Sequence, residues 1–485
     1  MSNSTAVEGL KPELLWKYFS EISRIPRGSK NEAAMTRYVL DTASKLGLEA
    51  KADNLGNVVV RKAASAGRRQ ARSVALQGHL DMVCEKNKDK VHDFLKDPIE
   101  LVRKDNLLMA NGTTLGADNG VAVAANLAIM EDRSLEHGPL ELLFTVDEET
   151  GLTGARNLTA DFLQSRTLLN LDSEEEGALY VGCAGGRDTL GTWKIHSEEV
   201  PGSRLALRIT VKGLKGGHSG LEIDKGRGNA IKIMGRALVA LSALGARLSF
   251  IEGGSKRNAI PRECEAVILI SPRRLKAARR TVGELNGTLR AELASAEPDL
   301  LVSLDEAGPM EKAIKRAEQR RILQAITALP HGVIKMSAEI PGLVQTSTNV
   351  AVIKTENDTV KLATSQRSSV ASEIVEIAAT VSTIFELARA SIEASDGYPG
   401  WKPNMESPVL NLARSVYRTL YGKDPEVKAI HAGLECGIIG ERIPGMDMLS
   451  FGPTLEGVHS PDERIHIDTV ERFWDFLLEL LKRID

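Results

Sequence analysis

The hydrophobic residues of this chain follow one pattern in its first and last parts and another pattern between them. In residues 1–186, largely apolar runs such as Val74–Leu76 and Leu140–Val146 alternate with stretches that carry apolar residues at helical spacing, for example 12–25 and 31–46. Apolar runs of this kind are typical of strands that are buried on both faces. The alternation predicts an α/β domain, a mostly parallel sheet covered by helices.

The pattern changes near residue 187. Leu205, Leu207, Ile209 and Val211 alternate with polar residues, which predicts an antiparallel strand with one face in solvent. Helical runs follow at about 227–244, 273–294, 310–328 and 370–393, and strand-like runs at about 263–270, 332–338, 344–353 and 358–365. After the turn residues at 395–400 the first pattern returns. We predict an inserted α+β domain at 187–395, which interrupts an α/β domain made of 1–186 and 396–485.

Length and composition argue against several classes of protein. A chain of 485 residues is too long for a single core, which agrees with two domains. A formal net charge of −3 and an aromatic content of 4% argue against binding to nucleic acid or to a membrane surface. The four cysteines are dispersed and form no Cys-x-x-Cys pair, which argues against a thiolate zinc site or a disulfide framework. Because the first residues lack a basic segment followed by an apolar one, and no apolar run reaches about 18 residues, we expect a cytoplasmic protein without a signal peptide or membrane span.

Side chains that can bind metal follow three of the apolar runs. His79 and Asp81 end the first run, Asp147-Glu148-Glu149 follow the second, and Asp172 follows a third at 167–171. Open α/β sheets place their binding sites at the C-terminal ends of strands. We therefore expect these side chains to lie close together.

Imidazoles and carboxylates without thiolates suit zinc, cobalt or manganese. A two-metal site needs about five ligands, one of which bridges, and it can polarise a carbonyl and activate water. Asp118, at the start of an apolar helix predicted at 121–130, can be one ligand, although a carboxylate there can also merely cap the helix. The candidate ligands are His79, Asp118, Glu149, Asp172 and His459.

Three acids near these ligands suggest further roles. Neighbouring side chains on an extended backbone diverge, so that one of Glu148 and Glu149 can bind metal while the other faces the substrate as a general base. Asp81 lies two residues after His79, on the same face of the predicted strand, where it can hold the second imidazole nitrogen. The alternative is that Asp81 and Glu148 are surface acids.

Together these motifs resemble those of the dinuclear-zinc peptidases related to aminoacylase and carboxypeptidase G. The stretches that carry the resemblance are Gly78–Asp81, Gly116–Gly120, Asp147–Gly151, Asp172 and His459. Further stretches resemble one branch, the aminoacyl-histidine (Xaa-His) dipeptidases, also called peptidase D or carnosinases: Val91–Phe94 with Asp97–Ile99, Asn111–Gly120, Gly216–Gly220, Gln345–Asn349 and Ile430–Gly437. The resemblance covers the chain from its N-terminal helix to His459.

The resemblance implies a ligand set. His79 and Asp172 would hold one zinc ion, Glu149 and His459 the other, and Asp118 would bridge them. In this family the peptide bond after the bridging aspartate is often cis.

The same resemblance implies that Glu148 is the general base, that Asp81 orients His79, and that the inserted domain is a lid. His218, in a glycine-rich turn of that domain, is similar to a histidine that stabilises the oxyanion, often from a partner subunit, and we therefore expect a homodimer. The alternative is that His218 has only a structural role in its loop.

Other residues of the inserted domain resemble substrate-binding residues. Asn258 and Arg367 are similar to residues that hold the substrate, and a guanidinium suits the free carboxylate of a dipeptide. The alternative is that both are surface polar residues. His431 and Gly433, near a predicted strand end, would line the same pocket.

The resemblance implies a metallo-dipeptidase that hydrolyses Xaa-His dipeptides such as β-Ala-His with two Zn²⁺ ions, for which Co²⁺ or Mn²⁺ can substitute. A water molecule between the metals would attack the scissile carbonyl while Glu148 accepts its proton. One alternative is an N-acyl-amino-acid deacylase or carboxypeptidase with the same metal centre. Another is a non-catalytic, metal-stabilised binding protein, against which the complete ligand set and the presence of Glu148 argue.

Overall fold

The computed structural model describes residues 3–485; the first two residues, part of the stretch in which a signal peptide was sought, lie outside the described range. The chain forms two compact units. Unit 1 consists of the chain up to Gly182, Trp401–Ala429 and Leu434–Asp485, and unit 2 consists of Cys183–Gly400 and Ile430–Gly433. Within residues 3–485, no helix combines the length and the apolar character needed to cross a membrane.

Unit 1 is built on an eight-stranded sheet in the order β1-β2-β6-β3-β7-β23-β8-β22. In its parallel centre, β3 (Val74–His79) lies between β6 (Leu140–Thr145) and β7 (Thr167–Asn170), and β7 pairs with β23 (Asp447–Ser450). The outer strands are β1 (Glu49–Ala52), β2 (Val58–Lys62), β8 (Ala178–Cys183) and β22 (Glu426–Ile430). The predicted α/β fold is confirmed, with antiparallel pairs toward the edges of the sheet.

The helix α4 (Ala117–Glu131) is almost entirely buried in unit 1, because α2 (Glu13–Ile22), α3 (Ala33–Leu46) and β3 all pack against it. The amphipathic α13 (Ile467–Arg483) packs on α11 (Pro408–Tyr421), which in turn contacts β23. The short elements of unit 1 are α1 (Asn3–Ala6), α5 (Glu148–Gly151), α6 (Thr153–Arg156), α12 (Glu435–Arg442), β4 (Leu101–Lys104), β5 (Leu107–Ala110), β24 (Leu455–Glu456) and β25 (Arg464–His466).

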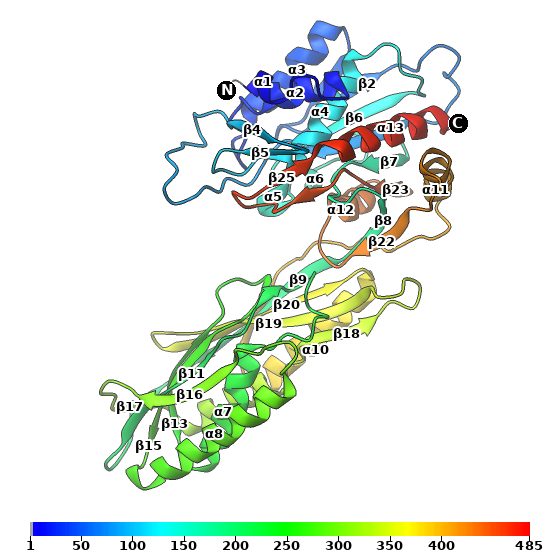
Figure 1. Ribbon diagram of the computed structural model, residues 1–485. Coiled ribbons are helices and arrows are strands. Elements are labelled where there is room, and N and C mark those ends of the chain that lie inside the picture. The colour runs from blue at the N-terminus through cyan, green and yellow to red at the C-terminus, as the bar shows by residue number, and fades with distance from the viewer. Residues whose placement is uncertain (1–2) are drawn as a thin grey trace. The chain divides into compact units, whose positions relative to one another are not determined.

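Unit 2 contains a nine-stranded sheet in the order β16-β11-β15-β13-β19-β20-β9-β21, with β18 beside β19 (Figure 1). Every strand pair described in this sheet is antiparallel. Its strands are β9 (Gly185–Lys194), β11 (Leu205–Lys212), β13 (Arg247–Gly253), β15 (Cys264–Ile270), β16 (Leu301–Glu306), β18 (Gly332–Met336), β19 (Val344–Glu356), β20 (Thr359–Ser368) and β21 (Ser391–Ala394). The helices are α7 (Ala230–Ala243), α8 (Leu275–Glu292), α9 (Arg316–Ala328) and α10 (Ala371–Leu387), with a short 3-10 turn at Pro272–Arg274.

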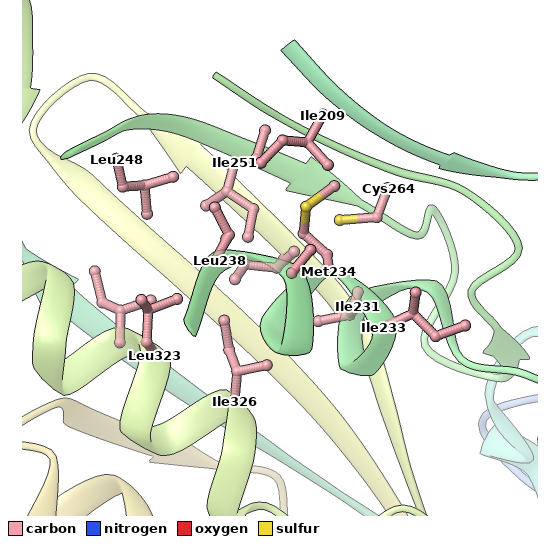
Figure 2. Packing of buried hydrophobic residues seen from close by; sticks show 14 of the residues in the cluster. Ile209, Ile231, Ile233, Met234, Leu238, Leu248, Ile251, Cys264, Leu323 and Ile326 are labelled. Carbon is pink, nitrogen blue, oxygen red and sulfur yellow. The ribbon is translucent and has the colours of Figure 1, made fainter. Parts of the chain in front are cut away.

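The core of unit 2 lies between this sheet and its helices (Figure 2). The buried side chains come from α7, α9 and the strands β11, β13 and β15, and include Ile231, Met234, Leu238, Leu323, Ile326, Ile209, Leu248, Ile251 and Cys264. In β11, Leu207, Ile209 and Val211 are buried and Arg208 is exposed. The alternating pattern therefore correctly predicted an antiparallel strand with one solvated face.

Two predicted helices of unit 2 are too long. The run 310–328 contains the strand β17 (Lys312–Ile314), which pairs with β10 (Ser197–Glu199) before α9 begins. The run 370–393 ends as a helix at Leu387, because Arg389 adopts a left-handed φ of 58° and the chain returns as β21 beside β9. The strands β9, β13 and β16 were not predicted, since glycine, serine and charged residues interrupt their apolar pattern.

Candidate functional site

Three strand ends of unit 1 bring acids and imidazole to one edge of the sheet. β3 ends at His79, β6 stops just before Asp147-Glu148-Glu149, and Asp172 lies two residues beyond β7. Because β3, β6 and β7 are parallel neighbours, their C-terminal ends meet. The prediction that these side chains lie close together is therefore correct.

Asp118 lies between two histidines. Its Oδ1 is 3.1 Å from His79 Nε2, and its Oδ2 is 3.1 Å from His459 Nε2. A second carboxylate reaches each histidine nitrogen: Asp172 Oδ1 is 3.3 Å from His79 Nε2, and Glu149 Oε2 is 3.0 Å from His459 Nε2. The five predicted ligands thus form two groups that share Asp118.

The donor set fits divalent cations. A ring nitrogen carries at most one hydrogen, yet two carboxylate oxygens converge on Nε2 of each histidine. Asp172 Oδ1 is buried and has no hydrogen-bond partner. In each group the potential ligand atoms lie within 4.8 Å of one another, and His79 with Glu148 and Glu149 also meets that spacing. A cation between the oxygens and the nitrogen would satisfy all of them at once.

Asp81 connects His79 to the turn that carries the two glutamates. Its Oδ1 lies 3.3 Å from His79 Nδ1 and accepts a 3.0 Å hydrogen bond from the Glu148 backbone N–H. Its Oδ2 accepts from the Glu149 backbone N–H at 3.2 Å and from the Ser29 hydroxyl at 2.8 Å. Burial alone would raise the pKa of Asp81, but the contact with His79 and its charge, followed by the hydrogen bonds from the Glu148 N–H and the Ser29 hydroxyl, lower it to about 2. Asp81 is therefore an ionised, fully buried acceptor.

Glu148 differs from its neighbours because it makes no side-chain hydrogen bond among those found in residues 3–485. Burial raises its pKa well above the usual value; the charge on His79 opposes this, and those of Asp172, Glu435 and Glu149 add to it. A carboxylate with a raised pKa holds a proton more readily than an ordinary glutamate, which suits a group that accepts and returns a proton.

Two residues that the sequence did not single out hold the loop of Asp118. The buried carboxylate of Glu463 accepts hydrogen bonds from the backbone N–H groups of Leu115, Gly116, Ala117 and Asp118, at 2.7, 3.0, 2.7 and 3.3 Å. The buried guanidinium of Arg27 donates to the carbonyl oxygens of Leu80, Asp81 and Gly116. Both residues bind backbone groups that are distant in the sequence, 345 or more positions for Glu463 and 53 or more for Arg27, so no local pattern indicates them.

The peptide bond between Asp118 and Asn119 is cis, as the family resemblance implies. The Asn119 side chain accepts from the His79 N–H at 3.2 Å and donates to the Leu171 carbonyl at 2.9 Å. A Cβ at Gly78 would lie only 2.5 Å from Asn119 Oδ1, so glycine is required where β3 passes this close to Asn119. Asn119 thus ties the start of α4 to the ends of β3 and β7.

In unit 2, His218 and Asn258 are neighbours, because β12 (Gly217–His218) pairs with β14 (Ala259–Ile260). His218 Nδ1 accepts from the N–H groups of Gly220 and Leu221, at 3.2 and 3.1 Å, so that its proton resides on Nε2. Burial, and then the charge of Arg367, lower the pKa of His218 to about 4. The Asn258 side chain is exposed.

The other three predicted residues of unit 2 also lie together. Arg367, on β20, is 6% exposed and donates from Nη1 to the Tyr398 hydroxyl at 2.9 Å. A Cβ at Gly433 would lie 2.9 Å from the Tyr398 ring. His431 is 6% exposed and its Nε2 is 2.7 Å from the Ser347 hydroxyl. Arg367 is thus buried rather than a surface polar residue, and Tyr398 is a member of the cluster that the sequence did not predict.

Known proteins resemble the whole chain. The sequence profile of "Peptidase family M20/M25/M40" matches residues 75–483. The "Cytosol non-specific dipeptidase" of Escherichia coli (strain K12) is 42% identical over 476 residues, which cover 98% of this chain and 98% of that protein. The aminoacylhistidine dipeptidase from Vibrio alginolyticus, known from a crystal structure, is 42% identical in sequence. The alignment covers 99% of this chain and 98% of that chain, with a TM-score of 0.91. The aminopeptidase PepT from Bacillus cereus, 16% identical with a TM-score of 0.58 over 98% and 99% of the two chains, shares the fold.

Proposed function

Because the chain belongs to peptidase family M20/M25/M40, we propose that it is a metal-dependent dipeptidase that acts on Xaa-His dipeptides such as β-Ala-His. The observation that carries the proposal is the pair of histidines that share Asp118 and each face a second carboxylate. The names of both 42% identical relatives support dipeptides as the substrates, and the name of the Vibrio alginolyticus relative supports Xaa-His dipeptides among them. A cytoplasmic location and a homodimer belong to the same proposal.

His79 and Asp172 would hold one metal ion, Glu149 and His459 the other, and Asp118 would contribute one oxygen to each. Two Zn²⁺ ions, or Co²⁺ or Mn²⁺ in their place, would polarise the scissile carbonyl and lower the pKa of water. The buried Asp81, whose Oδ1 lies 3.3 Å from His79 Nδ1, would fix the tautomer and orientation of His79.

Glu148 is the proton carrier in this proposal. Its carboxylate takes a proton from the attacking water and delivers it to the leaving amine. The backbone bonds from Glu148 and Glu149 to Asp81 keep the two glutamates in fixed positions. The raised pKa of Glu148 matches the requirement that one group both accept and donate.

The domain 187–395 would act as a lid on the catalytic domain formed by 1–186 and 396–485. In it, the Nε2–H of His218 is free to donate to the substrate carbonyl oxygen, since Nδ1 is already an acceptor. Asn258 lies beside it as a second polar contact, and Arg367 would bind the substrate carboxylate. His431 and Gly433 would line the same pocket.

A hydrolysis panel on metal-free protein reloaded with Zn²⁺, Co²⁺ or Mn²⁺ tests this proposal. We expect metal-dependent hydrolysis of β-Ala-His, Gly-His and Leu-Gly, and none of N-acetyl-Met. Hydrolysis of N-acetyl-Met alone would instead identify an N-acyl-amino-acid deacylase. Absence of hydrolysis across the panel with every ion would contradict an enzymatic role.

A further inference from the structure

Arg367 is a buried cation with little to compensate its charge. Its side chain is 6% exposed, Nη1 makes the one side-chain hydrogen bond described, and Nε is buried without a partner. Within residues 3–485 no carboxylate forms an ion pair with it. A buried guanidinium with unused N–H donors is a site for an anion, because burial without a counter-charge is costly.

Tyr398 supplies a second donor at the same place. A guanidinium has no acceptor, so the 2.9 Å contact is a hydrogen bond from Arg367 Nη1 to the Tyr398 hydroxyl oxygen. The hydroxyl hydrogen of Tyr398 therefore remains available, and no acceptor for it is found in the described part of the chain. Two donors, one of them charged, thus lie next to each other.

The ring of Tyr398 is held in place by two glycines. The backbone of Tyr398 exchanges hydrogen bonds with that of Gly186 at 3.0 and 2.9 Å. A Cβ at Gly186 would lie 2.4 Å from the ring, and one at Gly433 would lie 2.9 Å from its other edge. Glycine at both positions lets the backbone pack against the ring and keeps the hydroxyl directed at Arg367.

The neighbouring histidines add no charge at neutral pH. Burial, followed by the charge of Arg367, lowers the pKa of His218 to about 4 and that of His431 to about 3. The cluster of Arg367, Tyr398, His218 and His431 thus carries one net positive charge, which matches a single carboxylate.

We propose that the Tyr398 hydroxyl and the Arg367 guanidinium together bind the free α-carboxylate of the substrate, and that Tyr398 makes the enzyme selective for a free C-terminus. This inference rests on the proposed dipeptidase function and adds a residue that the sequence did not indicate. A carboxylate accepts the Tyr398 hydrogen and an N–H of Arg367 at once, whereas a neutral C-terminal amide lacks the charge that this pair of donors favours.

The test compares Gly-His with its C-terminal amide on metal-loaded protein. Tyr398→Phe keeps the ring and removes only the hydroxyl, so we expect a roughly 10- to 100-fold lower kcat/KM for Gly-His, mainly through KM. The kcat/KM for Gly-His amide should be unchanged. Tyr421→Phe, which removes a hydroxyl that donates to the Arg472 carbonyl in unit 1, is the matched control and should leave both substrates unaffected.

Binding measured by calorimetry separates this inference from the proposed function. On metal-loaded Glu148→Gln protein, Gly-His should bind more tightly than its amide, and Tyr398→Phe added to that protein should reduce the preference roughly 10- to 100-fold, with the remainder due to Arg367. If the native protein hydrolyses Gly-His but Tyr398→Phe changes neither kcat/KM nor this preference, the role of Tyr398 is wrong and the dipeptidase proposal stands. If no peptide is hydrolysed but the binding preference depends on Tyr398, the carboxylate site stands and the dipeptidase proposal is wrong.

Discussion

The two clusters of reactive side chains in this chain have opposite electrostatic character. In unit 1, Asp118, Glu149 and Asp172 converge on two histidines, so that negative charge is concentrated at the C-terminal edge of a parallel sheet. In unit 2, Arg367 is buried and, within residues 3–485, forms no ion pair with a carboxylate. Carboxylates outnumber the histidines in the first cluster, and the second contains a cation without an ion-pair partner, so each calls for a different ligand: cations in unit 1 and an anion in unit 2.

The supports of the two clusters also differ. The acids of unit 1 lie at strand ends or, for Asp118, at the start of α4, and backbone N–H groups that donate to Asp81 and Glu463 fix their positions. In unit 2 the support is steric, since glycine backbones pack against the ring of Tyr398. Removing a hydrogen bond that supports unit 1 should lower the free energy of unfolding and the affinity for metal. Disturbing the packing around Tyr398 should lower the affinity for substrate.

The largest expected effect is at Glu148. Glu148→Gln keeps the shape of the side chain but removes its proton-accepting charge, so kcat for Gly-His should fall by about 10²–10⁴-fold. Metal content, measured by mass spectrometry, should be unchanged, because Glu148 is not one of the five proposed ligands. Glu175→Gln, at an exposed glutamate of the same unit, should leave kcat as it is. Near-normal turnover of the Glu148→Gln protein with metal bound would remove Glu148 from the mechanism.

Glu463 tests the hydrogen-bonded support of unit 1. Glu463→Ala leaves up to four backbone N–H groups of residues 115–118 without their acceptor, so the free energy of unfolding should fall by about 2–4 kcal/mol. Denaturant unfolding measures the loss, and metal titration should show weaker binding because Asp118 lies in that loop. Glu456→Ala, at an exposed glutamate, is the control and should change neither the free energy of unfolding nor the affinity for metal. Equal stability of the two variants would show that Glu463 does not hold the loop.

Metal uptake in unit 1 should release protons. Hydrogen bonds to Asp118 and Glu149 raise the pKa of His459 to about 11, so His459 is protonated in the metal-free protein at neutral pH. A metal ligand must be deprotonated, so the apparent affinity should rise about tenfold per pH unit for each proton displaced between pH 6 and 8. Calorimetry in two buffers of different ionisation enthalpy counts these protons. An affinity independent of pH in that range would place His459 outside the ligand set.

The sequence predicted the parallel strands at the centre of unit 1 but missed β1 and β8 of the same sheet, as it missed β9, β13 and β16 in unit 2. The parallel strands of unit 1 are buried on both faces, so their apolar runs are continuous and the polar residue that ends each run, such as His79 or Asp172, stands out. The support from Glu463 was not predictable, because a carboxylate that binds backbone N–H groups 345 or more positions away leaves no pattern of side chains.

In unit 2, Tyr398 escaped prediction because it lies in the turn-rich stretch 395–400, which was interpreted as the end of a domain. His218, Asn258 and Arg367 were found through resemblance to a family, not through a local pattern. Antiparallel strands such as β9 and β13 contain glycine and charged residues, so they give weaker signals than the parallel strands of unit 1.

The smallest effect should come from Gly433, where steric support can be weakened without removing a polar group. In Gly433→Ala the new Cβ would lie 2.9 Å from Tyr398 Cε2, so the ring must shift by a few tenths of an ångström and its hydroxyl with it. We expect KM for Gly-His to rise by roughly 3- to 10-fold, since the hydrogen bond is weakened rather than lost. Gly287→Ala, in α8 with open space around the Cβ position, should leave KM unchanged. Because the proposed metal ligands of unit 1 are untouched, both variants should keep their metal content, and a loss of metal in Gly433→Ala would mean that the two clusters are not supported independently.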